Sequence, residues 1–257
     1  MEHQNEYHDS LVTLLELIWG EGFMAPGGEG NVANLIGDLD VRDKQVLDIG
    51  CGIGGPACLI ASHYGARVVG IDLEEHLIER ARARAIALGL DSRTEFNTVS
   101  PGPLDFPDQS FDVVMSSGAF TQTPSKHEIF GECLRMLRPG GTLTCYEWMK
   151  SEGDYSDDMR YFFKMEGLTY AMETLERYGQ ILGEVGFTDI QLKDASDWYR
   201  REVRREYEQL RSELYPRAVE LIGQHDADQF VENWRAMVVV CDKGEMRQGY
   251  CRARRAE

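Results

Sequence analysis

The stretch Val46-Leu47-Asp48-Ile49-Gly50-Cys51-Gly52-Ile53-Gly54-Gly55 decides the fold of this 257-residue chain. An apolar run followed by closely spaced glycines is typical of a buried strand that turns sharply into a helix. Glycines let the backbone approach a ligand closely, and the next helix presents its N-terminus to that ligand. Asp72, 22 residues after Gly50, ends the next apolar run, where a carboxylate can accept hydrogen bonds from both hydroxyls of a ribose.

Strand and helix patterns alternate around this segment. The expected strands are Val46–Ile49, Arg67–Ile71, Thr94–Val99, Phe111–Met115 and Thr142–Trp148. The expected helices are Leu11–Trp19, Asn31–Leu39, Pro56–Tyr64, Glu74–Leu88 and Lys126–Leu137, the last ended by Pro139-Gly140-Gly141. This alternation predicts an α/β fold with a parallel, doubly wound, Rossmann-like sheet.

The pattern changes after Lys150. Helices are expected at Met159–Tyr170, Leu175–Val185 and Tyr199–Leu221, and strands at Phe187–Lys193 and Gln248–Arg254. The charges of Asp197–Arg217 fall on most helix faces, which predicts a solvated lid helix rather than a partner-binding surface. We expect a single domain over 1–257, with an N-terminal cap (1–40), a ligand-binding core (41–150), and a helical lid with the last strands (151–257).

Composition excludes several classes of function. A formal net charge of -17 would repel a nucleic-acid backbone. No stretch approaches the roughly 20 apolar residues that span a bilayer, and Met1–Ser10 lacks the features of a signal peptide. The six cysteines form no CxxC pair, which predicts reduced thiols in a cytoplasmic protein, and the scattered histidines predict no metal site. We expect a monomer or a homodimer.

The glycine loop favours S-adenosylmethionine over a dinucleotide. The dinucleotide fingerprint runs GxGxxG and places a pyrophosphate at the helix N-terminus. This loop runs GxGxGG, and Asp48 stands two residues before its first glycine. S-adenosylmethionine has no phosphate, but it carries a cationic amino group that a nearby acid can help to hold.

The pattern Asp48-x-Gly50-x-Gly52-x-Gly54 resembles the first motif of the class I methyltransferases. Two later stretches, Phe106-Pro107-Asp108-Gln109-Ser110-Phe111-Asp112 and Leu137-Arg138-Pro139-Gly140-Gly141, fit the same family. The resemblance implies S-adenosylmethionine as cofactor, bound by Asp48, Gly50, Gly52, Gly54, Asp72, Leu73, Ser100 and Ser116. Ser100 is a departure, because an acid that contacts the adenine amine is usual at its position.

Segments outside the core resemble a narrower group. Tyr7, the run Trp19-Gly20-Glu21-Gly22-Phe23 and the pair Gly27-Gly28 resemble the N-terminal segment of phosphoethanolamine N-methyltransferases. The end of the chain resembles both that family and the sarcosine/dimethylglycine N-methyltransferases, through Trp234, Gly244, Arg247 and Gly249-Tyr250.

The same resemblance places Tyr7 over the active site, against a histidine that follows strand four in that family. Here Gln122 replaces the histidine, and Gly118 replaces an acid that precedes it. Gly244 or Glu245 stands where the family has a phosphate-binding lysine. We therefore do not expect phosphoethanolamine as substrate.

The glutamine leaves the acceptor open. An amine must lose its proton before it attacks a methyl group, whereas a thioether always carries a free lone pair. Gln122 can orient an acceptor but cannot take its proton, so we assign catalytic roles to Tyr7 and Gln122 as positioning groups. N-methylation of a small, glycine-derived or similar amine is our first expectation. S-methylation of a thioether or thiol acid, or cofactor binding without transfer, are the alternatives.

A cationic substrate or onium product favours aromatic and acidic neighbours, because a cation is stabilised over a π face. We expect Phe23, Trp148 and Tyr170 to bind the substrate, although core or lid packing would explain each of them as well. Glu147 is a candidate to attract a cation, and Arg247 a candidate to bind a substrate carboxylate.

Overall fold

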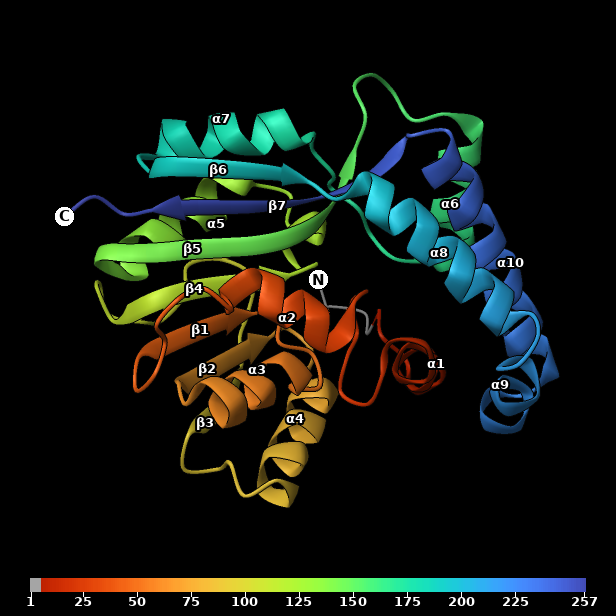
Figure 1. The fold of residues 1–257 in the computed structure, drawn as a ribbon, viewed down its shortest axis with the longest axis horizontal. Helices are drawn as coiled ribbons and strands as arrows, with labels where there is room; N and C mark the ends of the chain where they lie inside the picture. The colour runs from red at the N-terminus through yellow and green to blue at the C-terminus, as the bar shows by residue number, and fades with distance from the viewer. Residues whose placement is uncertain (1–5) are drawn as a thin grey trace.

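The computed structural model describes residues 6–257 as a single mixed sheet with helices on both faces (Figure 1). The strand order is β3-β2-β1-β4-β5-β7-β6. Strands β1 to β5 are parallel, and β7 is antiparallel to β5 and to β6. The strands are β1 Gln45–Ile49, β2 Arg67–Asp72, β3 Thr94–Thr98, β4 Phe111–Ser117, β5 Leu137–Lys150, β6 Thr188–Asp194 and β7 Met246–Arg254.

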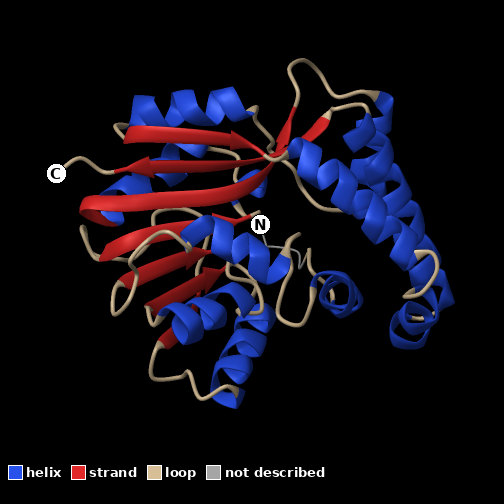
Figure 2. Ribbon diagram, in the orientation of Figure 1, coloured by secondary structure: helices blue, strands red, loops and turns tan. Residues whose placement is uncertain are grey.

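Two layers of helices cover the sheet (Figure 2). On one face lie α2 Gly28–Ile36, α3 Gly55–Leu59 with a π-helical turn at Ile60–Tyr64, and α4 Glu75–Ala87. On the other lie α5 Lys126–Met136 and α7 Leu175–Val185. Val46 belongs to the first core and its neighbour Leu47 to the second, because successive strand residues point to opposite faces. A central strand such as β1 therefore carries apolar residues on both faces.

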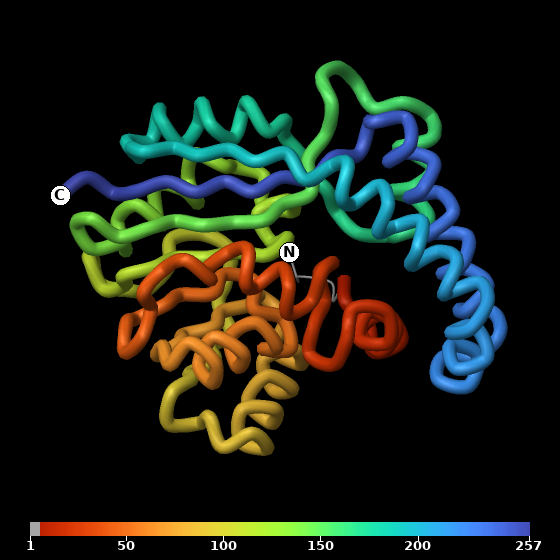
Figure 3. The backbone as a smooth tube through the Cα atoms, viewed as in Figure 1, coloured from red at the N-terminus to blue at the C-terminus, as the bar shows by residue number. Residues whose placement is uncertain are grey.

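Four helices form a lid at the end of the sheet toward which the parallel strands point (Figures 1 and 3). They are α6 Asp157–Glu166, α8 Ser196–Leu210, α9 Tyr215–Ile222 and α10 Gln224–Asp242, and α1 Asp9–Trp19 packs against them. Their apolar faces form a third core, which includes Trp148 at the end of β5. The lid therefore covers the edge at which a doubly wound sheet binds ligands.

A buried carboxylate ties α1 to the lid. The indole nitrogens of Trp19 and Trp234 donate to Glu206 of α8 at 2.8 Å and 3.1 Å. Burial raises the pKa of Glu206 to about 7, and the two indole hydrogen bonds oppose that rise. Through these bonds α1, α8 and α10 are held together.

The prediction of one helix over Tyr199–Leu221 was wrong. The chain breaks between α8 and α9, and Pro216 lies in the first turn of α9, where its missing N–H leaves no helical bond unmade. The parallel arrangement predicted for the first five strands is confirmed, and the later strand β7 is antiparallel to both of its neighbours. No element was predicted over α10, although Ala227, Trp234 and Cys241 are buried and recur at intervals of seven residues.

The cysteines all fall in described parts of the chain, and all six are free and buried. This arrangement agrees with the predicted reduced thiols. Within residues 6–257 we find no helix that is both long and apolar enough to cross a membrane.

Candidate functional site

The loop between β1 and α3 brings backbone close to its neighbours at each glycine. Gly50 has φ +74°, and a Cβ there would lie 2.1 Å from the Cβ of Ala119. Gly52 has φ +51°, and a Cβ there would lie 2.8 Å from the sulfur of Met24. A side chain at either position would be both strained and crowded, so the loop keeps this shape only with glycine there.

Asp72 fastens this loop to the end of β2. Its Oδ2 accepts the N–H of Gly52 at 2.9 Å, and its Oδ1 accepts the N–H of Glu74 at 3.1 Å. Burial raises the pKa of Asp72, although these N–H donors act in the opposite direction. Each carboxylate oxygen keeps a second lone pair, so Asp72 can still accept from sugar hydroxyls.

Two other predicted cofactor residues lie near the ends of β2 and β3. Leu73 follows Asp72 and is 40% exposed, which leaves its side chain free to cover a flat ring. Ser100 follows β3 by two residues and is exposed. Both positions belong to the carboxyl edge of the sheet, where the loop also lies.

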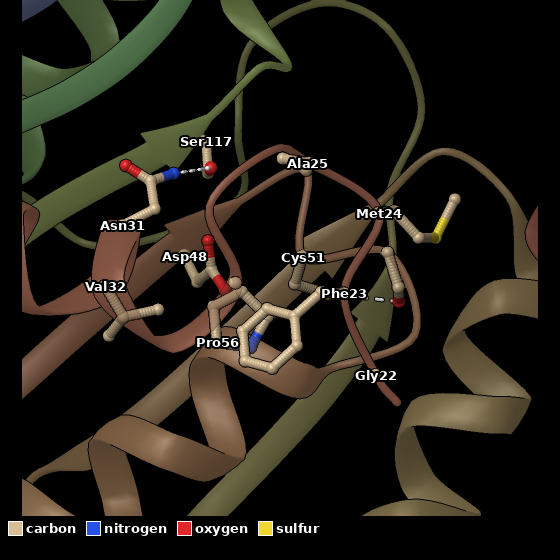
Figure 4. A pocket seen from close by; sticks show the side chains of 13 residues that line it. Gly22, Phe23, Met24, Ala25, Asn31, Val32, Asp48, Cys51, Pro56 and Ser117 are labelled. Carbon is tan, nitrogen blue, oxygen red and sulfur yellow. Dashed lines mark hydrogen bonds between the residues drawn. The ribbon is translucent and has the colours of Figure 1, made fainter. Parts of the chain in front are cut away.

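A pocket lies between the loop and the N-terminal segment (Figure 4). Asp48 and Phe23, both predicted from the sequence, line it together with Asn31 and Ser117. Asn31 donates from Nδ2 to the hydroxyl of Ser117 at 3.0 Å and accepts from the hydroxyl of Tyr250 at 2.9 Å. The pocket therefore combines a polar wall with an aromatic one.

Asp48 has an oxygen without a partner. It is 1% exposed, and its Oδ2 forms no hydrogen bond. Burial and the charge of Asp72 raise the pKa of Asp48 to about 7. Because a buried polar atom normally has a partner, this oxygen is suited to receive a cationic group of a ligand in the pocket.

Ser116, predicted from the sequence to bind the cofactor, does not line this pocket. Ser116 is completely buried, whereas its neighbour Ser117 lines the pocket. Alternate residues of β4 point to opposite faces of the sheet, so a shift of one residue changes the face. No local pattern marks Asn31, but Ser117 ends a parallel strand, which is a position that commonly faces a ligand.

Tyr7 and Gln122, the predicted catalytic pair, are in contact. The Tyr7 hydroxyl donates to Oε1 of Gln122 at 3.1 Å, and Nε2 of Gln122 donates to Glu6 at 2.8 Å. Glu6 also accepts the N–H and the hydroxyl of Thr169, at 3.2 Å and 2.7 Å. Burial and nearby carboxylates raise the pKa of Tyr7, so its phenol stays neutral and acts as a donor.

Glu166, at the end of α6, was not predicted. It accepts a hydrogen bond from the hydroxyl of Tyr170, whose ring stacks on Phe163 with centroids 4.8 Å apart. Burial raises the pKa of Glu166 to about 7, and its charge is close enough to raise the pKa of Tyr7. Glu166 occupies the last turn of a charged helix, so no local pattern distinguishes it from a solvated residue. We call Glu6, Tyr7, Gln122, Glu166, Thr169 and Tyr170 the acceptor cluster.

Three predicted substrate residues lie outside this cluster. Trp148 packs in the lid core against Tyr199, with ring centroids 5.3 Å apart. Glu147 has no exposed surface and accepts from Thr121, so it faces no accessible space. Arg247 is paired with Asp194 at 2.7 Å, which already satisfies its charge. The direct substrate contact predicted for Glu147 does not fit this placement.

The chain is similar to known methyltransferases. Residues 46–141 match a family model described as a methyltransferase domain. A phosphoethanolamine N-methyltransferase of Triticum aestivum is 31% identical over 95% of this chain and 48% of its own length. The chain thus spans about half the length of the curated plant relatives it matches.

Two solved structures share the fold. Phosphoethanolamine N-methyltransferase 2 of Haemonchus contortus, in complex with phosphomonomethylethanolamine and S-adenosylhomocysteine, has a TM-score of 0.91 at 23% identity, covering 99% of this chain and 59% of the other. A putative sarcosine dimethylglycine methyltransferase of Galdieria sulphuraria has a TM-score of 0.81 at 20% identity, covering 97% and 99%.

These findings support S-adenosylmethionine as the cofactor, and the residues fit it. Gly50 and Gly52 line the pocket with their backbone, Asp72 can accept from ribose hydroxyls, and the unpartnered oxygen of Asp48 can receive a cationic amino group. The pocket and the acceptor cluster adjoin through the N-terminal segment that carries Tyr7, Phe23 and Met24, since Tyr7 and Met24 pack against the same small core.

Proposed function

We propose that this chain, a member of the class I S-adenosylmethionine-dependent methyltransferases, methylates the nitrogen of a small amine to give an onium product. The observation that carries the proposal is Glu166, a carboxylate with a pKa raised to about 7 beside Tyr7 and Tyr170. Glu166 can accept the proton of the amine, whereas Gln122 cannot.

Bound S-adenosylmethionine supplies a methyl group on a positively charged sulfur, open to in-line attack by a lone pair. Asp72, Asp48 and the glycine loop would hold this cofactor from the sheet side. Tyr7 and Gln122 would orient the acceptor on the other side. Good alignment lowers the barrier because the acceptor loses its orientational freedom on binding, before the reaction.

Glu166 would bind the ammonium form of the acceptor and take its proton. A general base works best when its pKa lies near the working pH, and the pKa of about 7 meets that condition. Tyr7 and Tyr170 present aromatic surface and hydroxyl oxygens around the nitrogen, which favours a cation before and after transfer.

The charge of the acceptor cluster supports an acceptor without phosphate. Glu6 and Glu166 are acids, and within residues 6–257 no lysine or arginine forms a hydrogen bond or ion pair with a member of the cluster. A phosphate would meet the carboxylates of Glu6 and Glu166, and the buried cation beside the cluster, Lys126, is already bonded to the carbonyls of Thr123 and Ala171. The acceptors to test first are sarcosine, dimethylglycine and unphosphorylated amino alcohols, ahead of phosphoethanolamine.

S-methylation of a thioether acid is the second candidate. Gln122 favours it, because this residue orients an acceptor without removing a proton and a thioether has none to lose. The two candidates differ in pH dependence. Amine methylation should accelerate as the pH rises through about 7, whereas thioether methylation should change little.

The test is a transfer assay with isotope-labelled S-adenosylmethionine and a panel of amines, phosphorylated amines and thioethers. We expect label on the nitrogen of an unphosphorylated amine, with a rate that rises with pH. Label on sulfur with a flat pH profile would establish the second candidate. Cofactor binding without transfer to any acceptor would make the chain a binding module and contradict the proposal.

We also propose a cellular location and a physiological role for the reaction. Buried, reduced cysteines are typical of a cytoplasmic enzyme, and we propose that location. Onium compounds are common osmolytes, and the net charge of -17 agrees with a role in osmolyte synthesis.

A further inference from the structure

A single threonine fixes the turn that follows β4. The N–H of Thr121 donates to Oε2 of Glu147 at 2.8 Å, and its hydroxyl lies 3.0 Å from the same oxygen. The hydroxyl also accepts the N–H of Trp148 at 3.0 Å, and the Thr121 carbonyl accepts the N–H of Ala171 at 2.9 Å. Thr121 and Glu147 are 1% and 0% exposed, so the bonds between these two residues are internal.

The hydroxyl of Thr121 takes the place of a hydrogen-bonding partner that β4 no longer offers to the end of β5. β4 pairs with β5 only as far as Ser117 opposite Tyr146, while β5 continues to Lys150. Beyond that point the Thr121 hydroxyl lies within hydrogen-bond distance of both the N–H and the carbonyl of Trp148, at 3.0 Å and 3.1 Å. Buried backbone groups need such partners, so a side chain without a hydroxyl would leave them unpaired.

The bonds of Thr121 reach segments that carry residues predicted from the sequence for the acceptor site. Gln122 is the next residue in the chain, Trp148 is bound through its backbone, and Ala171 follows Tyr170. These residues come from three segments, namely the turn after β4, the end of β5 and the loop after α6.

We propose that Thr121, anchored by Glu147, is a positioning residue that sets the relative places of Gln122, Trp148 and Tyr170. The role rests on the proposed function, since it concerns the acceptor of that reaction. Neither residue touches the acceptor. Glu147, expected from the sequence to contact the substrate, acts on the site through Thr121.

The test compares isosteric variants of two buried threonines. Thr121→Val keeps the shape but removes the hydroxyl, and Thr121→Ser keeps the hydroxyl. Thr144→Val is the matched control, because Thr144 on β5 is 2% exposed and its hydroxyl donates to the carbonyl of Leu35 at 3.1 Å, away from the acceptor cluster. Thermal unfolding establishes that each variant is folded.

We expect Thr121→Val to lower kcat/KM for the acceptor by on the order of 10- to 100-fold, with unchanged affinity for S-adenosylhomocysteine. Thr121→Ser should recover most of that loss, and Thr144→Val should show none of it. Unchanged acceptor kinetics in Thr121→Val, or an equal loss in Thr144→Val, would overturn the proposal. If Thr121→Val does not fold, Glu147→Gln should show the same effect in weaker form, since a neutral amide is a poorer acceptor.

Amide hydrogen exchange gives a readout that does not depend on activity. The amides of Trp148 and Ala171 should exchange faster in Thr121→Val than in the wild type, and at the wild-type rate in Thr144→Val. Equal exchange in all three proteins would refute the positioning role. If the wild type methylates no acceptor, the proposed function fails, and exchange still decides whether Thr121 orders the three segments.

Discussion

The cofactor pocket and the acceptor cluster are neighbours, but they are built from the chain in different ways. The pocket is lined by two stretches of chain, residues 22–32 and residues 48–56, together with Ser117, and Asp72 fastens the glycine loop. The acceptor cluster joins the N-terminus, the turn after β4, and α6 with the loop after it, through side-chain hydrogen bonds.

The difference separates two kinds of control. Backbone geometry shapes the cofactor pocket, so it depends on glycine at fixed positions. Side chains brought together by the lid shape the acceptor cluster. Substitutions in this cluster can therefore change the substrate while the cofactor site stays the same. Substitutions should therefore divide into those that alter cofactor affinity and those that alter acceptor kinetics. A variant that changed both equally would break this division.

The largest expected effect is on the acceptor side. Glu166→Gln removes the proposed base and should lower kcat by about 10²- to 10⁴-fold, with affinity for S-adenosylmethionine unchanged. The rise in rate through pH 7, which reflects formation of the Glu166 carboxylate, should disappear. Steady-state kinetics over a pH series measure both effects, with Glu208→Gln on the exposed side of α8 as control. Wild-type kinetics in Glu166→Gln would remove this residue from the mechanism.

A matching effect is expected on the cofactor side. Gly50→Ala places a Cβ 2.1 Å from that of Ala119 at a left-handed φ, and should weaken S-adenosylmethionine binding by on the order of 10²-fold. Gly131→Ala is the control, because nothing lies within 4 Å of a Cβ there. Calorimetric titration measures both variants. Equal affinities would mean that the loop does not need glycine at position 50.

A smaller loss should follow from Asp72→Ala. Removing this carboxylate eliminates charge-assisted hydrogen bonds to the cofactor and to Gly52, so binding should weaken by about 1–3 kcal/mol. The acceptor KM, measured at saturating cofactor, should not change. An exposed aspartate, Asp91, provides the alanine control. Unaltered cofactor affinity in Asp72→Ala would contradict its assignment to the ribose.

The smallest effect is expected at Tyr7. Tyr7→Phe keeps the ring but removes the hydrogen bond to Gln122, worth about 1 kcal/mol, and should reduce turnover about fivefold. Cofactor affinity should fall less than turnover. Kinetics and calorimetry on the same preparation give the two numbers, and the opposite ranking would place Tyr7 with the cofactor rather than the acceptor.

The two regions also differ in how far the sequence predicts them. The loop, Asp48 and Asp72 follow from spacing alone, because one strand, its turn and the next strand bring them together locally. Tyr7 and Gln122 were paired only through a family resemblance, since they lie 115 positions apart. Glu166 had no local signal, because its neighbours Tyr7 and Tyr170 come from outside the helix that carries it. Ser116 was chosen instead of Ser117 because a spacing pattern does not show which face of β4 meets the pocket.

The most direct test of the account is a crystal structure with S-adenosylhomocysteine and an unphosphorylated amine. The account predicts the ribose hydroxyls at Asp72, the cationic amino group near Asp48, and the acceptor nitrogen between Tyr7 and Glu166. An adenosyl group bound elsewhere, or an amine that lies out of reach of both Tyr7 and Glu166, would contradict it.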